Sequence, residues 1–229
     1  MDSRAFCFPQ SHPSHRLLEE AWFAEPGFAF QRAMHDCGMA LGELFLSRLG
    51  VVPDRICVMA PAEDADGIAK GVCDFLQSKG VEVRLLCLWS RVERLYEEGI
   101  NVAPILRTFA EPGFDDSEVL VAVQAFVADG TILKTNITAA LQHFTPSKIH
   151  VLSPALHTGL KGELLPQFPA ALSERFEFHT FVYDTDLDRD TGELKPGIGG
   201  RGYERYGLPQ GKPYLDFPLS VLEILQRTA

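Results

Sequence analysis

The chain has 229 residues, of which 46% are hydrophobic and 23% are charged, as in an ordinary soluble globular protein. This length is enough for one domain with a sizeable core, or at most two small ones. The formal net charge of −10 argues against non-specific binding of nucleic acid, which depends on Lys and Arg to neutralise phosphates.

The cysteines and the length of the apolar runs indicate the cellular compartment that we expect for this protein. The cysteines are odd in number and irregularly spaced, which predicts small buried hydrophobic residues in a reducing compartment and no disulfide framework; they are Cys7, Cys37, Cys57, Cys73 and Cys87. No apolar run approaches the roughly 18 residues that a membrane span needs, and the first residues lack the apolar core of a signal peptide. We therefore expect a cytoplasmic protein without a membrane partner.

Helical and strand patterns alternate along the chain. Residues 1–16, which include Pro9 and Pro13, are expected to form a loose N-terminal arm, and residues 17–229 the folded domain. Periodicity and breaker residues predict helices at 17–22, 28–49, 68–79, 134–144 and 162–168, and strands at 56–60, 81–89, 119–127, 149–154 and 176–183. Such alternation predicts an α/β fold with a mainly parallel sheet and helices on both faces. Ligands of such sheets bind at the carboxyl ends of the strands.

Residues 192–207 are the most unusual stretch, because six of these sixteen residues are glycine. Glycine allows positive φ angles and a close approach of the backbone to a ligand, at an entropic cost. The stretch is therefore either a backbone-lined wall of a pocket for a flat polar molecule or a long mobile surface loop.

This stretch resembles the base-binding loop of uracil phosphoribosyltransferases, which has the pattern Gly-Tyr-Ile-Val-Pro-Gly-Leu-Gly-Asp-Ala-Gly-Asp-Arg. Phe28 to Glu43 is similar to a helix of that family. Val119 to Thr131 lies where the family has Asp-Pro-Met-Leu-Ala-Thr-Gly-Gly-Thr, and Tyr183 to Asp188 resembles its Ile-Asp-x-x-Leu-Asn segment. The resemblance implies a phosphoribosyltransferase-like domain over 17–229, with a C-terminal Gly-rich base-binding hood, a nucleobase or nucleotide as partner, and a homodimer. The base-binding residues that it implies are Leu194, Pro196, Gly197, Ile198, Gly199 and Tyr203.

The segment that should bind the sugar phosphate departs from the family pattern. Gln124 replaces the acidic residue and Asp129 the first threonine, whereas Gly130 is kept. A carboxylate at the phosphate position costs about 1–4 kcal/mol in repulsion. An anion site can still form from the helix N-terminus with Gly130, Thr131, Lys134, Thr135 and, after another strand, Arg91.

The loop at 61–67, Pro-Ala-Glu-Asp-Ala-Asp-Gly, replaces a basic loop of the family. Its three carboxylates repel pyrophosphate unless a metal ion intervenes. Carboxylate oxygens bind Mg²⁺, which makes magnesium a candidate cofactor, but a solvated cluster at a helix start is the alternative. No dedicated set of protein metal ligands is expected, because His143, His150, His157 and His179 have no acidic partner at ligand spacing.

Three functions are consistent with these residues. The first is pentosyl transfer or cleavage at the N-glycosidic bond of a pyrimidine-like base or nucleotide. In that case Asp129 or a loop carboxylate stabilises the cationic anomeric carbon, and Asp129 is the candidate catalytic residue. The second is a non-catalytic nucleotide- or base-binding regulator, and the third is a different reaction on a reused scaffold.

Overall fold

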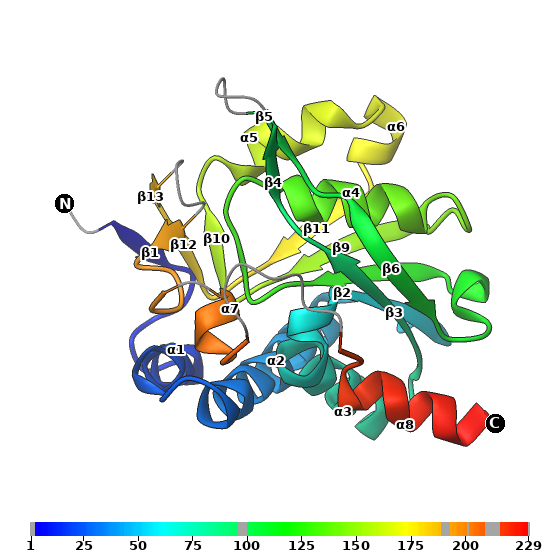
Figure 1. Cartoon of the computed structure of the whole chain (residues 1–229), viewed down its shortest axis with the longest axis horizontal. Helices are drawn as coiled ribbons and strands as arrows, with labels where there is room; N and C mark the ends of the chain where they lie inside the picture. Colours follow the sequence, from blue (N-terminus) through cyan, green and yellow to red (C-terminus); the bar gives the residue numbers. More distant parts are fainter. Residues whose placement is uncertain (1–2, 96–99, 189–192, 201, 209–215, 229) are drawn as a thin grey trace.

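A computed structural model describes residues 3–95, 100–188, 193–200, 202–208 and 216–228 (Figure 1). Its main sheet has six strands in the order β11-β9-β7-β2-β3-β6. All neighbours in this sheet are parallel except β6, which pairs antiparallel with β3 at the edge. The strands are β2 (Arg55–Pro61), β3 (Glu82–Ser90), β6 (Ile105–Ala110), β7 (Val119–Val123), β9 (Lys148–Leu152) and β11 (Phe176–His179).

Helices cover both faces of this sheet (Figure 1). One face carries α1 (Pro13–Phe23), α2 (Phe28–Arg48) and α3 (Lys70–Ser78), and the other carries α4 (Thr131–Ala140), α5 (Leu160–Leu164) and α6 (Ala170–Ser173). Successive residues of a strand point to opposite faces, so Ile56 and Val58 join the core under α2, whereas Cys57 and Met59 join the core under α4. The predicted α/β fold, with a mainly parallel sheet and helices on both faces, is confirmed.

A second sheet extends the first at the carboxyl ends of three strands. Its order is β1-β12-β10-β8, with β1 (Arg4–Phe6), β8 (Phe126–Val127), β10 (Ala155–His157) and β12 (Val182–Asp184). The strands predicted at 119–127 and 176–183 are therefore each divided in two. The Thr180 hydroxyl, which donates to the carbonyls of Pro154 and Val182 at 3.1 and 2.9 Å, stabilises one of these breaks.

The predicted loose arm over residues 1–16 is wrong at 4–6, which form a strand, and at 13–16, which begin a helix. Strand β1 pairs antiparallel with β12, with Arg4 opposite Asp184. Helix α1 begins already at Pro13, and the His12 side chain accepts the Ser14 N–H at 3.2 Å. Pro at the first helical position and a polar N-cap are good helix starts, so Pro13, which was one reason to expect an arm, marks the start of a helix.

Several elements had no prediction. They are the strands β6 and β10, the hairpins β4 (Glu93–Leu95) with β5 (Ile100–Val102) and β13 (Asp186–Asp188) with β14 (Glu193–Lys195), the 3₁₀ turns Ala62–Asp64 and Phe114–Asp116, the π-helical turn Ala65–Ala69, and the helices α6, α7 (Gly202–Arg205) and α8 (Leu219–Thr228). The helix predicted at 162–168 is replaced by α5 and the 3₁₀ turn Leu165–Gln167. Within the described ranges, no helix is both long and apolar enough to cross a membrane.

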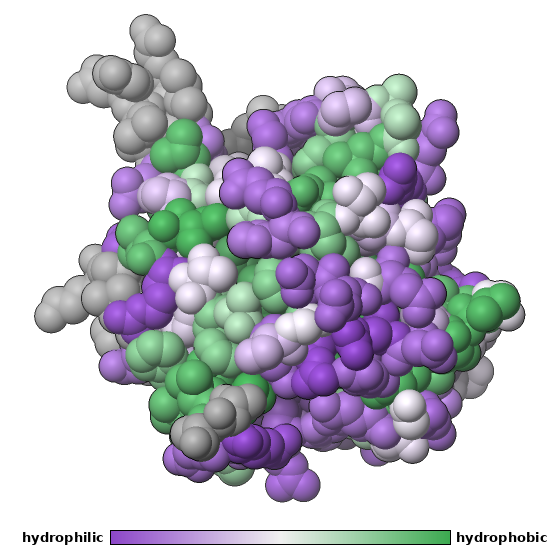
Figure 2. Space-filling model, turned by 90° about the vertical axis from the view of Figure 1, so that its right-hand side faces the viewer, coloured by the Kyte–Doolittle hydropathy of each residue, from purple (hydrophilic) through white to green (hydrophobic). Residues whose placement is uncertain are grey.

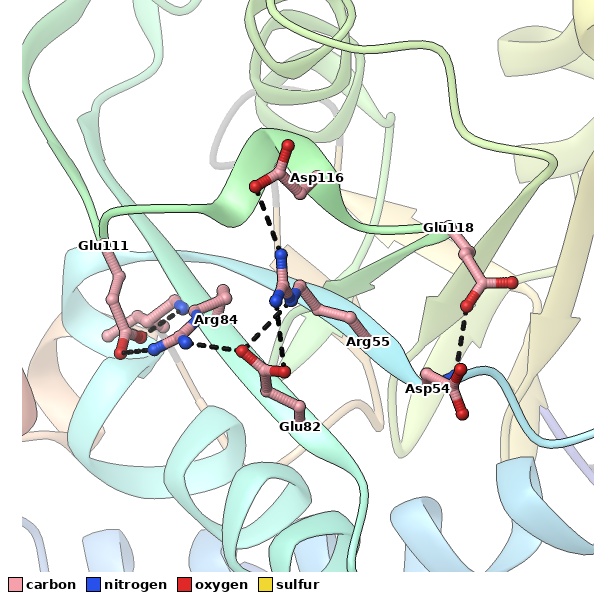
Figure 3. A network of polar contacts seen from close by, with 8 residues as sticks. Asp54, Arg55, Glu82, Arg84, Glu111, Asp116 and Glu118 are labelled. Carbon is pink, nitrogen blue, oxygen red and sulfur yellow. Dashed lines mark hydrogen bonds and ion pairs between the residues drawn. The ribbon is translucent and has the colours of Figure 1, made fainter.

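Ion pairs join the amino ends of β2 and β3 to the loops beside them (Figure 3). Arg55 pairs with Glu82 and Asp116 at 3.0 and 3.2 Å, and Arg84 pairs with Glu111 at 3.0 Å. Hydrophilic side chains gather in the middle of this side of the molecule, with apolar patches around them (Figure 2). Both arginines are paired with carboxylates and are therefore not available to bind an anion. The candidate site described below lies at the opposite, carboxyl edge of the sheet.

Candidate functional site

The first feature of the carboxyl edge is an acidic turn that follows β2. The chain leaves β2 at Pro61 and makes the 3₁₀ turn Ala62–Asp64. The Asp64 side chain is buried, and its Oδ2 accepts the Ala125 N–H at 3.0 Å, just after the neighbouring strand β7. The Tyr206 hydroxyl interacts with the same carboxyl group. The turn is thus held against β7 through one carboxylate oxygen.

Helix α7 and the residue after it cover this turn (Figure 1). A Cβ on Gly67 would lie 3.0 Å from the Tyr206 ring, and the Phe30 ring meets Tyr206 edge-on at a centroid distance of 5.0 Å. The Tyr206 hydroxyl is buried beside the Asp64 carboxyl, and burial together with the charge of Asp64 raises the pKa of Tyr206. Tyr206 therefore closes the loop onto the core, which leaves Tyr203 as the tyrosine available to a ligand.

The pKa values of the two acids in this turn and of Tyr203 are all raised. Burial, followed by the neighbouring charge of Asp64, raises the pKa of Glu63, and burial raises the pKa of Asp64 against the opposing Ala125 hydrogen bond. Burial and the charge of Glu63 also raise the pKa of Tyr203, while Arg91 lowers it. Two carboxyls held this close in a desolvated position retain a proton at pH values at which exposed carboxyls have lost theirs. Such a pair can donate and accept a proton near neutral pH.

The predicted catalytic residue, Asp129, lies at the N-terminus of α4. Its Oδ1 accepts the Thr131 N–H at 3.0 Å, and its Oδ2 accepts the Asn101 side-chain amide at 3.2 Å. The carboxylate therefore takes the place that an anion would occupy at a helix N-terminus. Gly130 has a left-handed φ of 75°, and a Cβ there would lie 3.0 Å from Leu160.

The other predicted sugar-phosphate residues are divided between two places. Thr131, Lys134 and Thr135 follow Asp129 on the first turns of α4 and are partly buried. Arg91 follows β3 and acts electrostatically on Tyr203. The phosphate role of these residues stays a prediction.

Asp66 shows how the acidic loop is used within the protein. Its two oxygens accept the backbone N–H groups of Leu219 and Ser220, each at 2.8 Å, so Asp66 caps the N-terminus of α8. With Asp64 bound to Ala125, two of the three loop carboxylates have protein donors. Because Asp64 and Asp66 already accept protein N–H groups, the loop does not fit a magnesium site made of its three carboxylates. The solvated cluster considered as an alternative is also wrong, because the helix that Asp66 caps is α8 and Asp64 is buried.

The glycine-rich loop after β14 packs against the protein itself. The Gly197 N–H donates to Asp184 at 2.8 Å, and Arg4 donates to the Gly197 carbonyl. Gly199 has a φ of 83°, and a Cβ there would lie 3.2 Å from Trp22. Leu194 and Ile198 are buried in the core. These glycines are thus needed for close packing, and base binding by Leu194, Pro196, Gly197, Ile198 and Gly199 stays a prediction.

Sequence reasoning identified the acidic loop at 61–67, including a loop carboxylate as a possible stabiliser of the anomeric carbon, but not the position of Glu63 and Asp64 under Tyr206. A second cluster was missed entirely. This cluster corrects the statement that the histidines lack an acidic partner, because Glu177 lies opposite His150 in the pairing of β9 with β11, two residues before His179. The alternation of Glu177 and His179, which puts both on one face of a strand, was the available signal.

Two surface hollows lie outside the acidic turn, and the first borders the glycine-rich loop through Arg4 and Trp22. One is lined by β1 and α1, including Phe6, His15 and Trp22, and the other lies between α1, α2 and α3. Neither contains the acidic turn. The candidate site is therefore defined by the chemistry of the loops at the carboxyl edge, where α/β sheets bind ligands.

Comparisons with known proteins give a likeness of fold. No protein-family model matches the chain, and no curated protein sequence is significantly similar to it. The AQ2163 protein of Aquifex aeolicus has a similar structure, with a TM-score of 0.66 and 15% identity over 89% of this chain and 99% of that one. A Neisseria gonorrhoeae protein with bound ppGpp gives a TM-score of 0.45 and 11% identity over 74% of this chain and 94% of that one. The APRTase of Giardia lamblia, complexed with 9-deazaadenine, gives a TM-score of 0.44 and 16% identity over 65% of this chain and 80% of that one.

Proposed function

We propose that the chain binds a nucleobase or nucleotide at the carboxyl ends of β2, β3 and β7 and transfers or cleaves the pentose at its N-glycosidic bond. The observation that carries this proposal is the desolvated pair of Glu63 and Asp64 beside Tyr203. The pair follows β2 at the carboxyl edge of the parallel sheet, where α/β sheets bind their ligands, and this position supports the proposal.

The chemistry requires one proton and one negative charge. Breaking an N-glycosidic bond leaves a base that must be protonated and an anomeric carbon that becomes positive. A protonated carboxyl beside an ionised one supplies both, one as general acid to the leaving base and one as electrostatic stabiliser of the anomeric carbon. In cleavage, water adds to that carbon and gives up a proton; in transfer, a second base takes the place of water. Glu63 is the more exposed of the two and would face the ligand, while the charge of Asp64, which is fixed by Ala125, helps to keep the proton on Glu63.

A pyrophosphorylated sugar is the less suitable donor. Asp129 already satisfies the N-terminus of α4, and the loop after β2 carries carboxylates where pyrophosphate would lie. We therefore propose a nucleoside or nucleotide as the donor of the pentose. Magnesium, the pyrimidine preference and the homodimer come only from the family resemblance, and they enter as secondary parts of the proposal.

A non-catalytic binding protein is the second candidate, favoured by the contacts that turn Asp66 and Asp129 into helix caps. Release of free base from uridine, uridine monophosphate and adenosine monophosphate, measured by chromatography, separates the two. We expect Glu63→Gln to lower turnover by about 10²–10⁴-fold. The remote surface variant Glu174→Gln is the matched control and should leave turnover unchanged.

Thermal shifts with the same ligands complete the test. Nucleotide-dependent stabilisation without base release in the wild-type protein would replace the enzyme by the binding protein. If phosphoribosyl pyrophosphate with Mg²⁺ stabilised the protein and the nucleosides and nucleotides did not, the proposal of a nucleoside or nucleotide as pentose donor would be refuted. Equal turnover of Glu63→Gln and wild type would remove the acid pair from the mechanism.

A further inference from the structure

A cluster of two histidines and a glutamate lies on β9 and the edge strand β11, away from the acidic turn, with His179 as the last residue of β11. His150 comes from β9, and Glu177 and His179 come from the edge strand β11. His150 Nδ1 is 3.0 Å from His179 Nε2 and 3.7 Å from Glu177 Oε2. One ligand atom of each residue lies within 4.8 Å of the others. The parallel register, with His150 opposite Glu177, creates this juxtaposition.

These distances are close to those between two ligand atoms of a tetrahedral metal site. A zinc ion binds imidazole nitrogen at about 2.0–2.1 Å and carboxylate oxygen at a similar distance, so two ligand atoms of a tetrahedral site lie about 3.3 Å apart. The observed 3.0 and 3.7 Å differ from this value by no more than a side-chain adjustment. Two imidazoles and one carboxylate leave the fourth position to water.

The surroundings keep both imidazoles in the form that binds metals. His150 and His179 are each 1% exposed, and the Phe45 ring on α2 covers both, at centroid distances of 4.8 and 5.7 Å. Burial lowers the pKa of each histidine to about 4, so both are neutral near pH 7. Glu177 is 41% exposed, which leaves the carboxylate side of the cluster open to solvent.

The two facing ring nitrogens are the atoms available to a metal ion. His150 Nδ1 and His179 Nε2 contact each other, and only one of them can carry the proton of this contact. A cation between them would use both lone pairs. The ring protons would then lie on the outer nitrogens, His150 Nε2 and His179 Nδ1, which have no hydrogen-bond partner in the described structure.

Two cations oppose metal binding at this position. Lys148 pairs with the other Glu177 oxygen at 2.9 Å, and Arg48 at the end of α2 acts electrostatically on His179. The ion pair of Lys148 leaves Glu177 Oε2 as the ligand oxygen, so the lysine weakens the site without blocking it. This opposition gives the test a variant that should bind more tightly.

We propose that His150, His179 and Glu177 bind one divalent transition-metal ion, with Zn²⁺ as the matching ion, and that the metal holds the edge strand β11 onto β9. Imidazole and carboxylate ligands suit Zn²⁺, whereas Mg²⁺ and Ca²⁺ prefer oxygen ligands alone. The position is independent of the proposed function, because none of its residues belongs to the acidic turn or to the α4 N-terminus.

The test uses the full chain after treatment with a chelator. Zn²⁺ is titrated in competition with a chromophoric chelator, and Co²⁺ is added separately to look for the visible absorption of a tetrahedral site. We expect one ion per chain and a melting temperature that rises by about 5–10 °C at 100 times the dissociation constant. Glu177→Gln should weaken Zn²⁺ binding at least 10-fold, and Lys148→Met should strengthen it several-fold.

The control is His143→Gln, which removes an exposed histidine outside the cluster. It should bind Zn²⁺ like the wild-type protein. Absence of saturable binding by the wild-type chain, or equal affinities of Glu177→Gln and wild type, would overturn the site. Loss of binding in His143→Gln would move the ion to the surface and overturn it as well. Both Glu177 and Lys148 are partly exposed, so their variants should fold.

Discussion

The buried ion pair of Arg4 with Asp184 should be one of the most sensitive points of this fold. Both Arg4 nitrogens, Nε and Nη2, donate to the Asp184 carboxylate at 2.7 Å, and the Gly197 N–H donates to it at 2.8 Å. The Asp184 side chain is 0% exposed and the Arg4 side chain 15%. One carboxylate thereby joins the first strand, strand β12 and the glycine-rich loop.

Asp184→Asn removes the charge and leaves the Arg4 guanidinium without its counterion. Removing one partner of a buried ion pair costs about 3–5 kcal/mol, because the remaining charge stays desolvated. For a chain of this size each kcal/mol shifts the melting temperature by about 2–4 °C, which predicts a decrease of about 6–20 °C. The matched control is Asp188→Asn, whose contact with Lys195 is longer, at 3.4 Å, and exposed. It should cost less than about 1 kcal/mol.

Urea unfolding followed by tryptophan fluorescence suits this test, since Trp22 packs against Gly199 in the loop that Asp184 holds. Replacing both partners, as in Arg4→Met with Asp184→Leu, should recover much of the loss, because no buried charge is then left unpaired. A loss below about 1 kcal/mol for Asp184→Asn, or a double variant no better than the single one, would refute this reasoning.

Three further predictions concern the core, the histidine pair and the α4 N-terminus. Gly38→Ala should destabilise the protein by more than about 3 kcal/mol in urea unfolding, because the new Cβ would lie 2.1 Å from a backbone carbonyl oxygen of the segment leading into α3. Gly162→Ala, whose Cβ would meet no atom within 4 Å, is the control. Equal losses of stability in the two variants would contradict the packing argument. The folded pKa values of His150 and His179, near 4, lie below the ordinary 6.5, so the unfolded chain takes up more protons and stability should be full above about pH 6.5 and fall toward pH 4. Urea midpoints of metal-free protein at pH 7, 5.5 and 4.5 would show this, and a His179→Gln variant with the same pH dependence as the wild type would speak against it. Asp129→Asn keeps an acceptor for the helix N–H but removes the negative charge, so uridine monophosphate should stabilise the variant more in thermal shifts; lost base release in this variant would restore Asp129 as a catalytic residue.

The local pattern of the sequence was sufficient to predict the order of the main helices and strands. Apolar residues recurring through 28–49 predicted α2, and the breaker residues around 61–67 marked the carboxyl end of β2. Such signals depend on neighbours within one or two turns, which is why they can be recognised without any knowledge of tertiary contacts. Glycine content alone, in contrast, could not distinguish a ligand from a tryptophan as the group that approaches Gly199.

Tertiary structure decided which distant groups meet. Asp64 reaches Ala125 across 61 positions, and Arg4 reaches Asp184 across 180. His150 meets His179 only because parallel strands pair in one particular register. Moving that register by one residue would turn Glu177 and His179 to the other face of the sheet. The partners of a side chain at the carboxyl edge or in the middle of a strand therefore depend on strand order and register, which arise from packing of the whole chain and not from the residues beside it.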